Sequence, residues 1–341
     1  MEHLAIDLGG RESQICVRRS DGQIVDERRC RTGALAAYLN GRPRSRVVME
    51  TCSEAFGVAD AALLAGHEVR VVPGTLVRSL GVGARRLKTD RRDAQILSEV
   101  SCRIDLPSVH VPSIEARQRK TFCGMREALV GARTKLLNTV RGWLRADGRR
   151  PRGGDVATFT TRVRDLCGET PLPSYVDRQL RMIDVLTEQI AKADRELTRT
   201  ANADPIARRL MTAPGVGPAT AVRFVAALDE IGRFTGAHAV ESYLGLVPGE
   251  DSSAERRRRT SITKAGPPAL RWCLVQAAWA VRRTRRRDPM HRWADEIEKR
   301  RGKRVAVLAL ARKLAGFCSR SGETAPSTSR VDPGRRNRPL D

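Results

Sequence analysis

Short apolar segments alternate with helix-like segments over the first quarter of the chain, and this alternation limits the possible folds. Two of these segments flank a Ser-Asp-Gly turn, which is the signal of a hairpin. The expected helices cover 34–40 and 54–65. The expected strands are 3–8, 14–18, 23–28, 46–50 and 67–72. Strands that alternate with helices predict an α/β domain.

The rest of the chain is predicted to be mainly helical. A long amphipathic helix is expected over 114–147, and apolar residues recur every seven positions from Val176 through Ile183 and Ile190 to Leu197. This repeat fits a helical hairpin or short coiled coil, and it fits an ordinary bundle helix equally well. Further helices are expected over 75–104, 238–244, 267–285 and 303–318, with disorder from Ser319 onward.

These segments divide the chain into four predicted parts. An α/β domain covers 1–108, and a helical or coiled-coil linker covers 109–203. A mainly helical domain follows over 204–320, and a disordered basic tail covers 321–341. The predicted fold class is therefore α/β plus all-α.

The charge of the chain points to a polyanionic partner. Lys and Arg number 63 against 39 Asp and Glu, a formal net charge of +24, and residues 255–341 alone carry +16. Nucleic acid is the first candidate for such a basic chain. The eight cysteines include no CxxC pair, which argues against a zinc site. With no signal peptide and no apolar run of about 20 residues, a cytoplasmic protein without membrane contact is expected.

Four acidic residues of the predicted α/β domain form a candidate metal site. Asp7 lies within an apolar run that ends at Gly9-Gly10, and Glu50 ends another apolar run. Asp90 and Asp93 are three residues apart and share one face of a helix. Each feature alone has an ordinary explanation, such as a strand end or a solvated helix face. Together they predict carboxylates that hold Mg²⁺ or Mn²⁺ for phosphoryl transfer.

These motifs carry a resemblance to a known family. The Asp-Leu-Gly-Gly start, the strand-ending Glu50 and the string Lys-Thr-Asp-Arg-Arg-Asp-Ala over 88–94 resemble the DEDD transposases of the insertion-sequence one-ten family. The resemblance implies an N-terminal domain similar to RuvC, an RNase H-like fold. It also implies that Asp7, Glu50, Asp90 and Asp93 take the four acidic positions of the family. The resemblance extends over about residues 1–320.

A glycine hairpin marks the C-terminal region. Gly215-Val216-Gly217 precedes a predicted helix, so its backbone amides could bind a phosphate as in a helix-hairpin-helix element. A turn that only packs helices together is an equally good explanation. The predicted nucleic-acid-binding residues are Arg85, Arg86, Lys88, Gly215, Gly217, Arg256, Arg257, Arg258, Arg259 and Lys264.

Paired serines precede the run of arginines. Without any family resemblance, a flexible basic loop is a better interpretation of this segment than a catalytic serine, because no base that could activate a serine is evident. The Gly-Leu-x-Pro, paired-serine and Ile-Thr-Lys-x-Gly signatures resemble the second domain of the same family, which implies a catalytic serine. Ser253 matches that position and Ser252 is the alternative. Ala254 stands where the family usually has Gly.

The resemblance implies more about function than the residues do. It implies transposition of an insertion sequence through DNA strand cleavage and exchange, with a 5′-phosphoserine-type intermediate. It further implies a structured non-coding bridge RNA that pairs with donor and target DNA. A homodimer or tetramer associated with the bacterial nucleoid is expected. Such sequence-blind binding agrees with a basic chain in which only 4% of residues are aromatic.

Three other functions stay open from the sequence. A RuvC-like junction nuclease would need only the four carboxylates, and a decayed transposase would bind nucleic acid without cutting it. A sugar kinase or ATPase of the actin-like class could use Asp-Leu-Gly-Gly as a phosphate loop. The missing adenosine motif and the positive charge argue against this third function.

Overall fold

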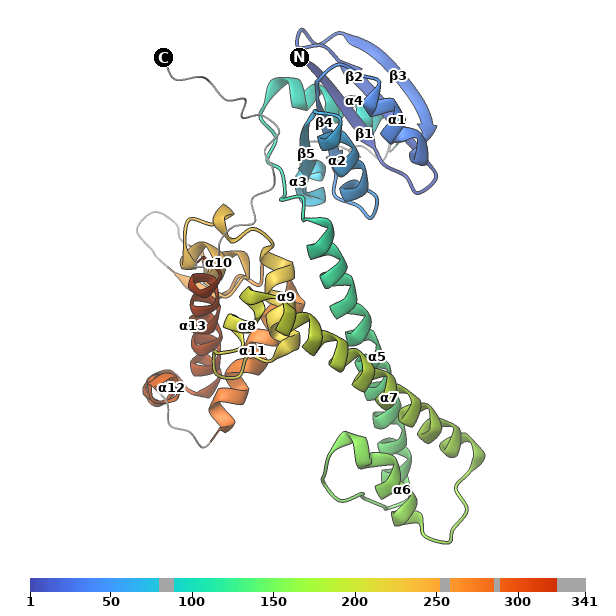
Figure 1. Cartoon of the computed structure of the whole chain (residues 1–341), viewed down its shortest axis with the longest axis vertical. Coiled ribbons are helices and arrows are strands. Elements are labelled where there is room, and N and C mark those ends of the chain that lie inside the picture. Colours follow the sequence, from blue (N-terminus) through green and yellow to red (C-terminus); the bar gives the residue numbers. More distant parts are fainter. Residues whose placement is uncertain (80–88, 252–257, 285–288, 324–341) are drawn as a thin grey trace. The chain divides into compact units, whose positions relative to one another are not determined.

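The computed structural model describes residues 1–79, 89–251, 258–284 and 289–323 (Figure 1). Its contacts divide the chain into two compact units, Met1–Pro112 and Ser113–Asp341. The predicted α/β domain ends four residues before the first unit does. Apart from residues 109–112, the predicted linker lies with the predicted C-terminal domain in the second unit, and the four-part division stays a prediction.

A five-stranded sheet forms the centre of the first unit. The strand order is β3-β2-β1-β4-β5. β1 pairs antiparallel with β2 and parallel with β4, while β2–β3 is antiparallel and β4–β5 is parallel. The strands are β1 (Glu2–Asp7), β2 (Glu12–Arg18), β3 (Ile24–Arg31), β4 (Ser45–Glu50) and β5 (Glu68–Val72). The mixed α/β region predicted from the sequence is confirmed.

The two faces of this sheet have separate cores, because neighbouring strand residues point to opposite sides. One face packs Leu4, Ile6 and Met49 against helices α1 (Leu35–Asn40) and α2 (Ala55–Leu64). The other face packs Ala5, Val48 and Val72 against Leu97 of helix α4 (Asp90–Arg103). The short helix α3 (Gly74–Ser79) follows β5.

Two long helices begin the second unit. α5 (Ile114–Ala146) and α7 (Ser174–Ala203) pack along each other, with α6 (Phe159–Cys167) between them in sequence. The heptad residues Val176, Ile183, Ile190 and Leu197 are all buried. Val176 and Ile183 pack in one cluster with Val140 and Leu144 of α5. The repeat therefore forms a helical hairpin, which was one of the two predicted arrangements.

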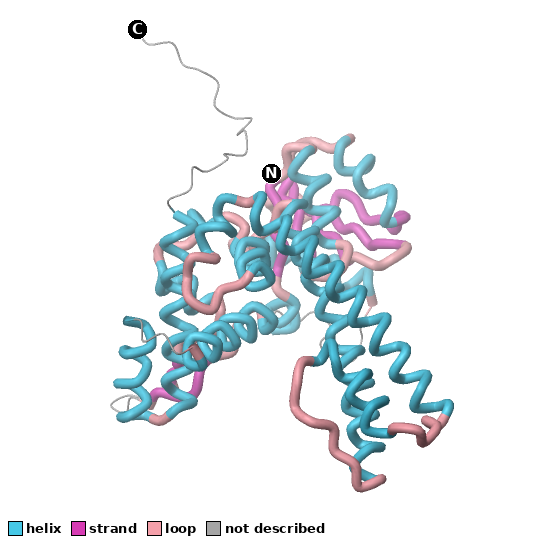
Figure 2. The backbone as a smooth tube through the Cα atoms, turned by 60° about the horizontal axis from the view of Figure 1, so that its bottom comes forward, coloured by secondary structure: helices cyan, strands magenta, loops and turns pink. Residues whose placement is uncertain are grey.

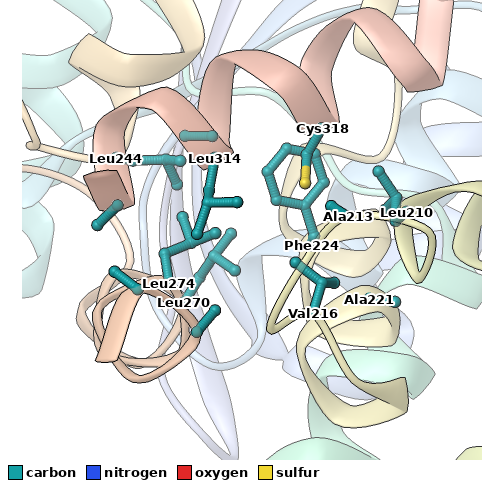
Figure 3. Packing of buried hydrophobic residues seen from close by; sticks show 14 of the residues in the cluster. Leu210, Ala213, Val216, Ala221, Phe224, Leu244, Leu270, Leu274, Leu314 and Cys318 are labelled. Atoms are coloured by element: carbon teal, nitrogen blue, oxygen red, sulfur yellow. The ribbon is translucent and has the colours of Figure 1, made fainter. Parts of the chain in front are cut away.

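The remainder of the second unit is a compact helical domain with one small strand pair (Figure 2). Side chains from several of these helices meet in one core, and Figure 3 shows Leu210, Val216, Phe224, Leu270 and Leu314 in it. The elements are α8 (Pro205–Leu210), α9 (Pro218–Leu228), α10 (Ala237–Tyr243), β6 (Pro248–Glu250), β7 (Arg259–Ile262), α11 (Pro268–Arg283), α12 (Pro289–Arg301) and α13 (Lys303–Glu323). The mostly helical C-terminal part predicted from the sequence is confirmed.

The end of the ordered chain was predicted too early. α13 continues to Glu323, whereas disorder was expected from Ser319. Cys318 and Ser319 are 1% and 0% exposed, so packing against the core keeps the last turns helical despite their polar sequence. Residues 324–341 lie outside the described residues. In the described part of the chain, no helix is both long and apolar enough to cross a membrane.

Candidate active site

Asp7 and Glu50 end two neighbouring strands at the same edge of the sheet. β1 and β4 are parallel and Ile6 pairs with Met49, so the next residues in register are Asp7 and Glu50. Ala5 and Val48, two residues earlier, lie beneath α4. Because residues two apart point to the same side of a strand, both acids are on the α4 face.

Helix α4 runs opposite to β1 on this face. His3 Nδ1 lies 2.9 Å from Ser101 Oγ. Ser98 Oγ donates to Cys16 Sγ at 3.3 Å, and Cys16 pairs with Ala5. Two strand residues span about 6.6 Å, the rise of four or five helical residues. Asp93 lies five residues before Ser98, and Asp7 lies two residues after Ala5. We therefore infer that Asp93 lies level with Asp7.

Asp93 is the most buried of the four predicted acids. Its side chain is on the sheet side of the first turn of α4, where the residue is 6% exposed. Thr89 caps this helix by accepting a hydrogen bond from the Arg92 amide. Among the described residues, no group forms a hydrogen bond with the buried Asp93 Oδ1. A buried carboxylate oxygen without a partner is costly, so it fits a site that receives a cation.

Asp90 differs from Asp93 although both lie in the first turn of the same helix. Asp90 is exposed at the first helical residue. The turn of the helix therefore directs one carboxylate into the protein and leaves the other toward solvent. In the described residues, no three His, Cys, Asp or Glu side chains are gathered as a metal site. The four-carboxylate metal site stays a prediction.

Sequence reasoning missed Gly74, which lies beside the Glu50 carboxylate. A Cβ added to Gly74 would overlap the Glu50 carboxylate, so a larger residue here would displace that side chain from its position. The Gly74 amide donates to Thr51 Oγ1 at 3.2 Å, which fixes the start of α3 beside the end of β4. The Pro73-Gly74 pair directly after a strand was the available signal.

The serine segment connects β6 and β7. Ser252, Ser253, Ala254, Arg256 and Arg257 lie outside the described residues, as do Arg85, Arg86 and Lys88 of the first unit. The two ends of the serine segment are joined, because the Asp251 amide donates to the Arg258 carbonyl at 2.9 Å. Arg258 is exposed, and Arg259 begins β7.

The glycines of the two flanking signatures hold this hairpin. Gly245 and Gly266 have φ of +65° and +69°, which favour glycine. A Cβ on Gly266 would overlap the Tyr243 carbonyl, and one on Gly245 would overlap the backbone of Ala265. Lys264 is exposed with φ 56°, and its amide donates to the Gly245 carbonyl at 3.1 Å. The two signatures therefore meet backbone to backbone.

The Gly215–Gly217 hairpin connects α8 and α9. Gly215 has φ +78°, and a Cβ there would overlap the Ala277 carbonyl of α11. Close packing against α11 therefore explains this glycine. Gly217 is the N-cap of α9, and no atom lies within 4 Å of the position its Cβ would take. Phosphate binding at this helix start stays a prediction.

Two family models match the sequences of these regions. One, the IS110 DEDD domain described as Transposase, matches residues 4–146. The other, described as Transposase IS116/IS110/IS902 family, matches residues 207–293. The chain belongs to the IS116/IS110/IS902 family of transposases. The first match covers the acidic face of the sheet, and the second contains the serine segment.

Curated relatives of this transposase match over nearly its whole length. A probable family 20 transposase of Pseudomonas aeruginosa is 28% identical over 92% of this chain and 95% of its own length. The transposase for insertion sequence element IS1328 of Yersinia enterocolitica is 29% identical over 92% and 94%. The transposase for element IS1111A of Coxiella burnetii is 26% identical over 92% and 87%. The family implied by the sequence motifs is thus confirmed.

Proposed function

We propose that this transposase cleaves and exchanges DNA strands through a RuvC-like metal domain and a serine nucleophile, guided by a structured RNA. DNA transposition follows from membership of the family. The metal site, the serine nucleophile and the guide RNA are the further parts of the proposal. The strand order β3-β2-β1-β4-β5, with acids at the ends of β1 and β4, supports the RuvC-like assignment.

The buried Asp93 Oδ1 is the observation that carries the metal part. It lies on the same face of the sheet as Asp7 and Glu50, near the ends of their strands. Asp7, Glu50, Asp90 and Asp93 would hold the ion, and carboxylate oxygens are the ligands that Mg²⁺ prefers. When bound, the ion would stabilise negative charge on the oxygens of the scissile phosphate. Thr89 caps the helix that carries Asp93, and Gly74 leaves space beside the Glu50 carboxylate.

The serine step would use Ser253, with Ser252 as the neighbouring alternative. The serine oxygen forms a bond to the scissile phosphorus, and the bond from phosphorus to the leaving strand breaks. The serine proton passes to the leaving strand, which departs as a free hydroxyl. That hydroxyl end of the exchanged strand then reverses the step and releases the serine. Arg256 to Arg259 and Lys264 would offset the negative charge of the phosphate.

Nucleic-acid partners follow from the same proposal. Donor DNA, target DNA and guide RNA are all polyanions, and residues 113–341 carry 46 Lys and Arg against 25 Asp and Glu. Positive side chains bind phosphates without reading bases, so base pairing with an RNA would supply the choice of sequence. Assembly as a homodimer or tetramer would bring two cleavage sites to the two DNA molecules.

The deciding experiment replaces Ser253 in the full-length protein. Purified Ser253→Ala is incubated with Mg²⁺, DNA carrying the joined element ends, and RNA transcribed from the adjacent non-coding segment. We expect neither a covalent protein–DNA adduct on denaturing gels nor strand exchange, whereas Ser261→Ala in β7 should retain both. Continued cleavage by Ser253→Ala would show a metal-dependent nuclease instead. Exchange without RNA would remove the guide from the proposal.

A further inference from the structure

One face of α11 carries two tryptophans, of which Trp272 is exposed and Trp279 is partly buried. Trp272, Gln276, Trp279 and Arg283 follow one another at intervals of four, three and four residues, so they share one side of the helix. The opposite side packs Leu270, Leu274 and other apolar residues into the core. Trp272 is 58% exposed. We call these four residues the α11 tryptophan face.

A hollow adjoins the C-terminal end of this face. Its volume is ≈ 340 Å³, and its lining is Trp279, Arg282, Arg283, Glu298 and Lys303. Trp279 also packs against the hydrophobic core, which holds the indole in place. The Lys303 ammonium lies 5.3 Å from the centroid of this ring. An aromatic ring and a cation are therefore presented together in one open hollow.

The charge of the hollow is positive. Arg282 is ion-paired with both Asp295 and Glu298, so these three side chains together carry one net negative charge, and Arg283 and Lys303 bring the whole group to one net positive charge. Arg283 and Lys303 have no carboxylate partner among the described residues. Both side chains are exposed. Two cations are thus left to neutralise an incoming anion beside the Trp279 ring.

The other end of the face lies near the start of α9. Trp272 and Gln276 adjoin Thr220 and Arg223 of that helix in a smaller hollow of ≈ 90 Å³. Arg223 is paired with Glu127 at 2.7 Å, so it contributes less net charge than Arg283 does. The open indole of Trp272 is the main feature of this end. The two indoles are seven residues apart, a rise of about 10 Å.

We propose that the α11 tryptophan face binds an unpaired nucleic-acid strand, with bases stacked on Trp272 and Trp279 and phosphates on Arg283 and Lys303. Every base has a flat face that can stack on an indole, whereas bases inside a duplex are already stacked on each other. The proposal rests on the proposed function as a nucleic-acid enzyme, and it adds the class of substrate that this surface takes. A rise of about 10 Å exceeds the step of about 3.4 Å between stacked bases, so the bound strand is extended here.

The test measures binding by the full-length protein at fixed salt with fluorescent dT20, rU20 and a 20-base-pair duplex. We expect Trp279→Leu to weaken single-strand binding about tenfold, within the range for loss of one stacked base, and to leave duplex binding within about twofold. Trp279→Phe keeps a stacking ring and should restore most of the affinity. Trp272→Leu should give a similar loss, and Trp143→Leu on α5 is the matched control. Equal losses of affinity for dT20 and rU20 would mean that the face binds DNA and RNA strands alike. A loss for only one of them would identify the kind of strand that binds there.

Three outcomes would overturn the proposal. Unchanged single-strand affinity in the double Trp272→Leu, Trp279→Leu variant is the first, and equal losses for single strand and duplex are the second. The third is a change in the sedimentation of the protein without a change in nucleotide binding, which would make the face a protein contact. Thermal melting checks that each variant is folded. Asp93→Asn should keep single-strand affinity while losing cleavage, so failure of the metal proposal and failure of this one give different results.

Discussion

The two units differ in their net charge and in which of their described charged side chains are left without an ion pair. Residues 1–112 carry 17 Lys and Arg against 14 Asp and Glu, while residues 113–341 carry 46 against 25. In the first unit, arginines such as Arg42 and Arg70 are each ion-paired with two carboxylates, while the buried Asp93 Oδ1 has no hydrogen-bond partner among the described residues. In the second unit, cations such as Arg283 and Lys303 line an open hollow beside an indole.

This difference separates two tasks that one surface would perform poorly. Carboxylates that gather around a cation repel phosphate until the cation is bound. A dense positive surface attracts nucleic acid but would hold such carboxylates in ion pairs. The first unit leaves a carboxylate free, and the second leaves cations free. Each of the following predictions tests one of the two units.

The largest effect is expected for Asp93→Asn. Removing one carboxylate of the proposed metal site should lower Mg²⁺-dependent cleavage by about 100-fold or more, an amount of transition-state stabilisation typical of one electrostatic group. The same change removes a buried unpartnered charge, so the metal-free protein should melt at the same or a higher temperature. Glu99→Gln, on the same helix and paired with Arg103, is the control. Cleavage by Asp93→Asn at the original rate would contradict the metal assignment.

A large effect on stability is expected in the second unit for Gly266→Ala. The new Cβ would overlap the Tyr243 carbonyl at a positive φ, which should cost about 2–3 kcal/mol. Gly302→Ala has φ +81° but open space around the Cβ, so it should cost only about 1 kcal/mol. Denaturant unfolding measures both values. Equal losses would show that the contact between the two signatures does not matter.

A smaller effect on cleavage is expected for Gly74→Ala. The added Cβ would displace the Glu50 carboxylate and should lower Mg²⁺-dependent cleavage about tenfold, with little change in melting temperature. Raising the Mg²⁺ concentration should recover part of the loss if Glu50 is a ligand. Gly57→Ala, in α2 with no atom within 4 Å, is the control and should leave cleavage unchanged. A loss that Mg²⁺ does not relieve would speak against Glu50 as a ligand.

The smallest effect concerns alkaline pH. Burial raises the pKa of the Cys318 thiol to about 12, above the value of about 9 expected in the unfolded chain. The folded state therefore keeps the proton while the unfolded state loses it. This contribution is fully present below about pH 9 and is lost as pH rises toward 12, by up to about 1.4 kcal/mol per pH unit. Cys318→Ala should flatten that slope in unfolding measured from pH 8 to 10.5, and an unchanged slope would contradict the assignment.

The sequence predicted the strand ends better than the surroundings of the acids. Asp7 and Glu50 follow short apolar runs, and such runs end where a strand leaves the core, so their place at one sheet edge could be predicted. The different exposure of Asp90 and Asp93 could not, because it depends on how α4 is rotated against the sheet. The place of Gly74 against Glu50 also requires contacts between segments distant in sequence.

The short apolar runs, the heptad repeat and the family motifs determined the elements, their class and the transposase family from the sequence alone. These signals are local, since each comes from neighbouring residues or from the period of one helix or strand. Only the tertiary structure decided that the Asp93 carboxylate is buried with an oxygen unpartnered among the described residues. It also decided that the backbones at Gly245 and Gly266 bring the two signatures into contact, and that the α11 tryptophan face borders an open hollow. The physical reason is that burial and contact depend on how helices and strands pack, and that packing joins residues that the chain separates.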